Sequence, residues 1–111
     1  MSRRLLVALL TCGLLAATEA AADYPFTFDE GRRCRPAVAD FLRDLAIPEE
    51  TIESITFKEK TSPSLTFPRL IGFEAWVRPR DIKGYLVIHL GVGCGIQRAH
   101  TTGDYEVEGL R

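Results

Sequence analysis

Residues 70–90 read LIGFEAWVRPRDIKGYLVIHL, two apolar runs separated by a short polar segment. In both runs apolar side chains alternate with other residues, which is typical of strands because successive side chains point to opposite faces of a sheet. The segment between them, residues 79–83, contains proline and several charges and predicts a turn. The stretch therefore predicts a β-hairpin with strands over residues 70–78 and 84–90.

The two faces of this hairpin differ in character. We expect Phe73 to lie opposite Ile88 and Ala75 opposite Leu86, because this register gathers the apolar side chains on one face. That face carries Ile71, Phe73, Ala75, Val77, Leu86, Ile88 and Leu90. The other face carries Glu74, Trp76, Arg78, Tyr85, Val87 and His89. The apolar face is the one that another element must cover.

Two further strands extend the hairpin into a sheet. Residues 91–93 are glycine-rich and form a short connection to a strand over residues 94–101, which makes that strand an antiparallel neighbour. We expect Leu90 to lie opposite Cys94, so that Cys94 points to the apolar side. Residues 54–60 alternate as well and predict another strand. The sequence thus predicts a small antiparallel meander of three to four strands.

Residues 34–46 have a helical period instead. Their apolar residues recur at spacings of three and four and form one stripe, which consists of Cys34, Val38, Phe41, Leu42 and Leu45. Pro36 suits the first turn of a helix, and Pro48 disfavours helical geometry at the residue before it. We therefore expect one N-terminal helix that ends by residue 46 or 47.

Cys34 and Cys94 are predicted to form a disulfide. Cys34 lies on the apolar stripe of the expected helix, and Cys94 lies on the apolar side of the expected sheet. The alternative, a redox thiol activated by the arginines around Cys34, lacks the Cys-x-x-Cys pair typical of that chemistry. Pattern and cysteine pairing agree on an α+β fold, in which the helix packs on one face of the meander and one disulfide staples the two layers.

Residues 1–22 are typical of a secretory signal peptide. Arg3 and Arg4 precede an apolar stretch of about a dozen residues, and small residues at Ala20 and Ala22 form a cleavage signal. That stretch is shorter than the roughly 20 residues a spanning helix needs, so we expect no membrane anchor after processing. An exported protein, periplasmic or extracellular, meets the oxidising conditions that favour a disulfide.

Residues 23–111 are expected to form a single small domain. They hold 12 Lys and Arg and 14 Asp and Glu, a net charge near −2 that provides no footprint for nucleic acid. A chain of 89 residues buries a modest fraction of its surface, so a covalent staple is useful.

The sequence shows no motif for catalysis, for a metal or for a cofactor. Residues 91–95 are rich in glycine, but a phosphate-binding loop must precede a helix, whereas a strand follows here. The expected register places His89 opposite Gly95 and His100 opposite Gly84, too far apart to ligate zinc together. We therefore expect no cofactor, no metal and no enzymatic activity.

The face opposite the helix is the candidate binding site. Its proposed binding residues are Trp76, Arg78, Tyr85, Val87 and His89. Aromatic side chains that gather on an open surface are enriched at interfaces. The alternative is that residues 24–28, or residues 61–69 with Leu65 and Phe67, fold back over this face.

These features favour a non-enzymatic exported binding module whose partner is a protein or an envelope component. Two alternatives remain open. The first is a structural or accessory envelope protein that forms a homodimer through the same face. The second, which has less support from the sequence, is a small secreted enzyme.

Overall fold

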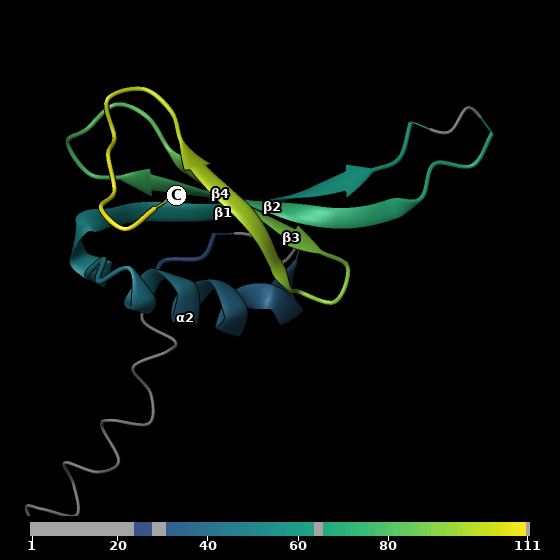
Figure 1. Cartoon of the computed structure of the whole chain (residues 1–111), viewed down its shortest axis with the longest axis horizontal. Coiled ribbons are helices and arrows are strands. Elements are labelled where there is room, and N and C mark those ends of the chain that lie inside the picture. The colour runs from purple at the N-terminus through teal and green to yellow at the C-terminus, as the bar shows by residue number, and fades with distance from the viewer. Residues whose placement is uncertain (1–23, 28–30, 64–65, 111) are drawn as a thin grey trace, which may run out of the picture.

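The computed structural model describes residues 24–27, 31–63 and 66–110. Within them the chain forms, in order, η2 (Arg32–Cys34), α2 (Arg35–Asp44), η3 (Glu49–Thr51), β1 (Ile52–Thr61), β2 (Leu70–Pro79), β3 (Leu86–Gly91) and β4 (Ile96–Thr101), where η marks a 3₁₀ helix (Figure 1). The described strands make one antiparallel sheet in the order β1-β2-β3-β4. The expected α+β class and antiparallel meander are confirmed. The expected signal peptide lies outside the described residues.

Helix α2 is bounded by its own sequence. Pro36 occupies the first turn, where a missing N–H has no intrahelical partner to lose. The helix ends in a Schellman motif, in which the Ala46 N–H donates to the Arg43 carbonyl at 2.9 Å and the Ile47 N–H to the Leu42 carbonyl at 3.0 Å. Ala46 adopts φ 60°, a left-handed conformation that favours glycine. The chain is thereby turned away from the helix axis toward η3.

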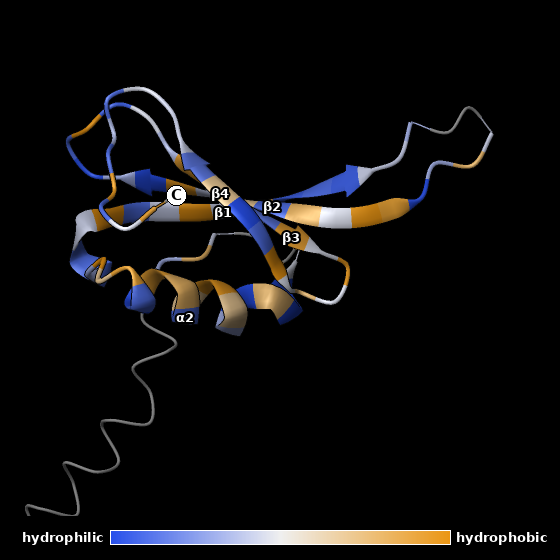
Figure 2. Cartoon of the chain, in the orientation of Figure 1, coloured by the Kyte–Doolittle hydropathy of each residue, from blue (hydrophilic) through white to orange (hydrophobic). Residues whose placement is uncertain are grey.

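Helix and sheet contribute to the same apolar core. Figure 1 shows α2 running beside one face of the sheet, and Figure 2 shows hydrophobic and hydrophilic residues alternating along the strands. The cluster of buried residues includes Val38, Ala39, Leu42, Ile55, Phe57, Phe73, Ala75, Val77, Leu86, Ile88 and Leu90. Ile71 was expected in this core but is 49% exposed. The reason is that the β1–β2 hairpin extends past α2, and Ile71 is the second residue of β2 (Figure 1).

The register of the β2–β3 hairpin differs from the expected one by two residues. Phe73 lies opposite Leu90 and Ala75 opposite Ile88. The cause is a longer turn, since β3 begins at Leu86 rather than at residue 84. An even shift keeps every side chain on its expected face, so the division into two faces is unaffected.

β4 contains a β-bulge that the sequence pattern did not predict. His89 lies opposite Arg98 and Leu90 opposite Ile96, so Gln97 is an extra residue on β4. Cys94 was expected within this strand, opposite Leu90. It lies instead in the β3–β4 turn, where its φ is 73°.

The predicted disulfide between Cys34 and Cys94 is confirmed. The two Cα atoms are 5.1 Å apart, and Cys34 is fully buried. Arg33 next to it donates a hydrogen bond to the Val92 carbonyl at 2.7 Å, so the start of the helical segment holds the β3–β4 turn through two links. A disulfide is typical of proteins outside the cytoplasm. Across the described ranges, no helix has the length and apolar character needed to cross a membrane.

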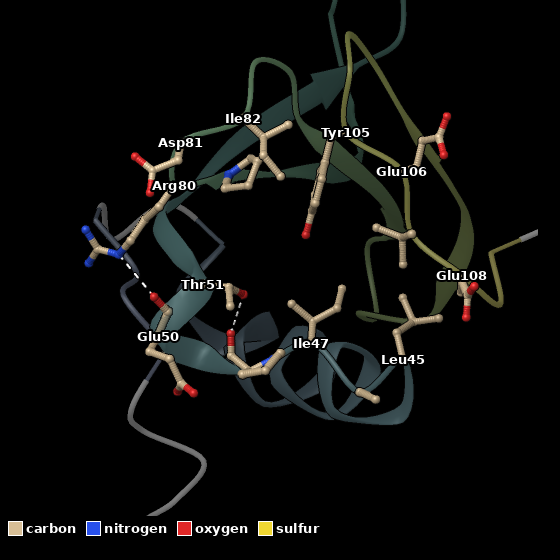
Figure 3. Close-up of a pocket in the computed structure, with 14 residues that line it drawn as sticks. Leu45, Ile47, Glu50, Thr51, Arg80, Asp81, Ile82, Tyr105, Glu106 and Glu108 are labelled. Atoms are coloured by element: carbon tan, nitrogen blue, oxygen red, sulfur yellow. Dashed lines mark hydrogen bonds between the residues drawn. The ribbon is translucent and has the colours of Figure 1, made fainter.

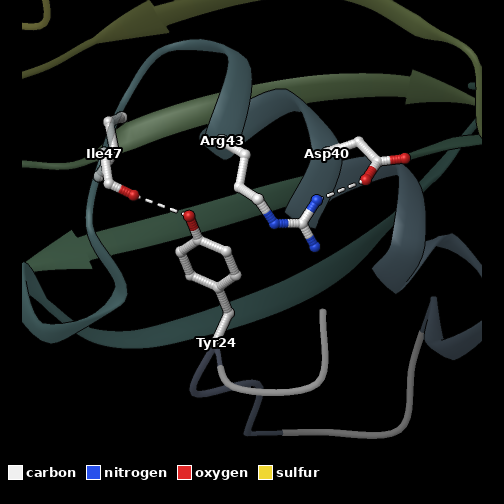
Figure 4. Close-up of polar contacts among 4 residues, drawn as sticks. All are labelled: Tyr24, Asp40, Arg43 and Ile47. Atoms are coloured by element: carbon white, nitrogen blue, oxygen red, sulfur yellow. Dashed lines mark hydrogen bonds and ion pairs between the residues drawn. The ribbon is translucent and has the colours of Figure 1, made fainter. Parts of the chain in front are cut away.

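Residues 24–27 join the end of α2 to the edge of the sheet. The Tyr24 hydroxyl donates to the Ile47 carbonyl at 2.7 Å, close to the ion pair between Arg43 and Asp40 (Figure 4). Phe26 forms a parallel bridge with Ile55 and stacks on Phe57 at 5.8 Å, and Phe57 belongs to the buried cluster. Tyr24 and Phe26 therefore add to the core, and this part of the segment does not cover Trp76.

Candidate functional site

We define the open face as the side of the sheet opposite α2. The strand register places on it Lys58, Lys60, Glu74, Trp76, Arg78, Val87, His89, Arg98 and His100, together with Tyr85 just before β3. Lys58, Glu74, His89 and Arg98 form one row across four strands, and Thr56, Trp76, Val87 and His100 form the next row. The face predicted from alternation in β2 and β3 therefore continues onto β1 and β4.

Trp76 lies near the middle of this face and is held from three sides. Tyr85 meets its ring edge-on, with ring centroids 5.2 Å apart. The Lys58 ammonium lies 4.3 Å from the ring centroid, a cation–π contact. The indole N–H donates to Glu74 Oε1 at 2.9 Å. Trp76 is thus partly exposed but fixed in orientation, which lowers the entropy that a partner would have to remove.

A shallow hollow of about 290 Å³ opens beside Trp76. Its lining consists of Ser54, Thr56, Lys58, Trp76, Arg78 and Tyr85. Lys58 and Arg78 are exposed and form no ion pair with any described residue. The hollow therefore presents two cations and three hydroxyl groups around an aromatic surface, and none of its lining residues is acidic.

Two of the predicted binding residues are less accessible than expected. Val87 and His89 lie on the open face, but they are 1% and 5% exposed. Val87 is short and lies between the larger Trp76 and His100 in its row, so the two rings shield it. The expectation that Val87 and His89 would be surface contacts is wrong, whereas Trp76, Arg78 and Tyr85 all line the hollow.

His89 is the centre of a polar cluster that the expected register missed. The bulge at Gln97 turns His100 to the open face, where its ring stacks on His89 with centroids 5.2 Å apart. Lys60 reaches His89 from β1, with Nζ 3.3 Å from Nδ1, because β2 presents Gly72 between them. The expectation that the two histidines lie far apart is therefore wrong.

The surroundings of His89 favour its neutral form. Burial lowers the pKa of His89, and the positive charges of Lys60 and Arg98 lower it further, against a smaller opposing effect of Glu74. An ammonium donor at Nδ1 places the imidazole proton on Nε2, and this atom is buried without a hydrogen-bond partner. In the described part of the chain, no group of three or more His, Cys, Asp or Glu residues is arranged to hold a metal ion.

The open face is positively charged although the chain as a whole is not. Lys58, Lys60, Arg78 and Arg98 lie on it, against Glu74 as its one acid among the described residues. The complete chain has a formal net charge of −1 at pH 7. Charge is therefore segregated, with the cations gathered around Trp76.

A second cavity, which we call the tail pocket, lies at the C-terminal end of α2. It has a volume of about 610 Å³ and lies between residues 45–51, residues 79–82 and residues 105–108 (Figure 3). Its walls are largely apolar and include Leu45, Ile47, Ile82 and Val107. Four acidic residues, Glu50, Asp81, Glu106 and Glu108, also line it. They come from three segments far apart in the sequence, so no local sequence motif predicts this acidic lining.

Tyr105 points its hydroxyl into the tail pocket (Figure 3). The side chain is 8% exposed, and burial raises the pKa of its hydroxyl. The hydroxyl has no hydrogen-bond partner among the described residues, whereas Thr51 close by donates to the Pro48 carbonyl at 2.7 Å. The pocket therefore contains one protonated phenol with a free donor and acceptor.

Comparison with known proteins gives no relative for this chain. It matches no protein-family model, no curated protein and no solved structure.

Proposed function

We propose that this chain is a small exported binding module without catalytic activity, which contacts a protein or an envelope component in the periplasm or outside the cell. The contact is made by the open face. The proposal takes α2 to be packed across the opposite face of the sheet. The shared buried cluster of helix and strand residues supports this packing, because Val38 and Leu42 belong to it together with Ile55 and Ile88.

The observation that carries the proposal is the hollow beside Trp76. Trp, Tyr and Arg supply much of the binding energy in interfaces, and all three types lie together in this hollow. Lys58 and Arg78 flank the ring, and Tyr85 supports it. A partner surface with negative charge and a ring or apolar group fits this arrangement by charge and by shape.

The same charges disfavour the alternative of a homodimer through the open face. In a two-fold symmetric dimer the same patch meets itself. Lys58, Arg78 and Arg98 of one copy would then face the same cationic surface of the other, and like charges in contact are repulsive. We therefore rank a partner of opposite charge above self-association.

The fluorescence of Trp76 offers a direct test, because it is the one tryptophan of the chain. We expect dextran sulfate, a polyanion, to change the emission of Trp76, and uncharged dextran of the same length to leave it unchanged. Binding should weaken as the salt concentration rises, since exposed charges are screened. The double variant Lys58→Gln/Arg78→Gln should lose most of the response.

The matched control removes two cations away from the open face, with the variant Arg32→Gln/Arg43→Gln. Both residues are exposed and belong to the helical segment. If this control weakens binding as much as the Lys58/Arg78 pair, the attraction comes from overall charge and the proposed site is wrong. If only the Lys58/Arg78 pair weakens binding, the natural component can be captured from an envelope extract. The Trp76→Ser/Tyr85→Ser variant serves as the comparison.

A further inference from the structure

The tail pocket is a site separate from the open face, with which it shares no lining residue. Its volume of about 610 Å³ falls within the roughly 300–1,000 Å³ range of small-molecule sites. Such sites combine apolar walls with a small number of placed polar groups.

We propose that the tail pocket binds a small organic amine, in which a cationic nitrogen is carried on an aromatic or aliphatic body. The body is received by apolar side chains from three segments. Leu45 and Ile47 follow α2, and Ile82 belongs to the β2–β3 turn (Figure 3). Val107 comes from the tail. Ile82 is 45% exposed, so its side chain leaves apolar surface at the mouth of the pocket.

The positive charge is attracted by two independent sources. Glu50, Asp81, Glu106 and Glu108 line the pocket, against Arg80 as the single cation of the lining. The Arg80 side chain donates to the Glu50 carbonyl at 3.2 Å. In Figure 3 its guanidinium and the four carboxylates all lie at the rim and point away from the centre, so the acids attract a cation at the mouth of the pocket. In addition, α2 ends beside the pocket, and the carbonyl end of a helix carries a partial negative charge.

Tyr105 supplies a specific contact. The residue is 8% exposed, and its hydroxyl points into the cavity and has no hydrogen-bond partner among the described residues, so it can accept a hydrogen bond from an ammonium group. Its ring offers a face for a cation–π contact.

A titration with three ligands that share one body tests the proposal. The probes are 2-phenylethylamine, the neutral 2-phenylethanol and the anionic 3-phenylpropanoate, followed by amide chemical shifts of the oxidised exported protein. We expect the amine to shift residues 45–51, 79–82 and 105–108. The alcohol should bind about fivefold more weakly, and the acid more weakly still. Equal binding of amine and alcohol, or shifts confined to the open face, would overturn the proposal.

Variants separate the two contributions. Glu50→Gln/Glu106→Gln should weaken the amine and leave the alcohol unchanged, whereas the control pair Asp40→Asn/Glu59→Gln, outside the pocket, should alter neither. Tyr105→Phe should weaken the amine by about three- to tenfold, the value of one hydrogen bond.

A second variant keeps the test valid if the Tyr105 change disturbs the fold. Ile82→Ala removes an exposed side chain from the mouth of the pocket and should weaken all three probes. Unchanged amine affinity in folded Ile82→Ala and Glu50→Gln/Glu106→Gln proteins would refute the site. Trp76→Ser/Tyr85→Ser should bind the amine normally, so that a failure of the proposed function and a failure of this proposal give different results.

Discussion

Replacing Cys34 and Cys94 together with alanine should lower the free energy of unfolding by about 2–4 kcal/mol. The two residues are separated by 60 positions. Closing a loop of that length removes roughly 14 cal/mol/K of entropy from the unfolded chain, or about 4 kcal/mol at 25 °C. This is an upper value, because the unfolded chain retains some structure. Alanine is chosen because Cys34 is fully buried, where the hydroxyl of serine would need a hydrogen-bond partner.

Urea denaturation followed by circular dichroism measures this loss. The slope of free energy against urea is fitted separately for wild type and the double variant, because removing the cross-link lets the unfolded chain expand. The variant Arg33→Gln is the control, since it removes the other link between the helical segment and the β3–β4 turn, an exposed hydrogen bond. Its effect should stay below about 1 kcal/mol. A double variant within about 0.5 kcal/mol of wild type, or two titratable thiols in unfolded, unreduced protein, would refute the reasoning.

Three further perturbations probe separate parts of the fold. Gly72→Ala should destabilise by about 1–3 kcal/mol, because the new methyl group would collide with the β3 backbone, whereas Gly95→Ala meets no atom and should be nearly neutral by urea denaturation. Tyr24→Phe should cost about 1–2 kcal/mol in the same assay, since the Ile47 carbonyl loses its buried donor. The pKa of His89 is lowered in the folded protein, so below about pH 6.5 the unfolded chain binds a proton that the folded chain does not. The free energy of unfolding should therefore decrease as the pH is lowered, by no more than about 1.4 kcal/mol per pH unit. Thermal melts between pH 7.5 and 5 should show a smaller pH effect in His89→Gln, and an unchanged slope would contradict this account.

Alternation and cysteine pairing were sufficient to predict the α+β class, the antiparallel sheet and the disulfide. Strand parity in β2 assigned Phe73 and Trp76 to opposite faces, and it did so despite a register error of two residues, since an even shift preserves parity. The disulfide followed from two cysteines left after the predicted processing. Periodicity and cysteine count can both be read from the sequence without knowledge of the tertiary fold.

What could not be predicted depended on single backbone irregularities and on distant segments. The extra residue Gln97 reverses parity along β4, so His100 could not be assigned to the same face as His89 from alternation alone. The acidic lining of the tail pocket contains Glu50 and Glu106, which are separated in the sequence by all four strands of the sheet. Only the tertiary fold brings such residues together.

The disulfide also determines how the molecule responds to mechanical force. The bond closes a covalent ring that contains α2, η3, β1, β2 and β3, while β4 and the tail lie outside the ring. A pull applied between the two ends of the chain crosses directly from Cys34 to Cys94 and bypasses residues 35–93. The oxidised protein can therefore lengthen by unzipping β4, but its remaining strands are shielded from the load until the bond is reduced.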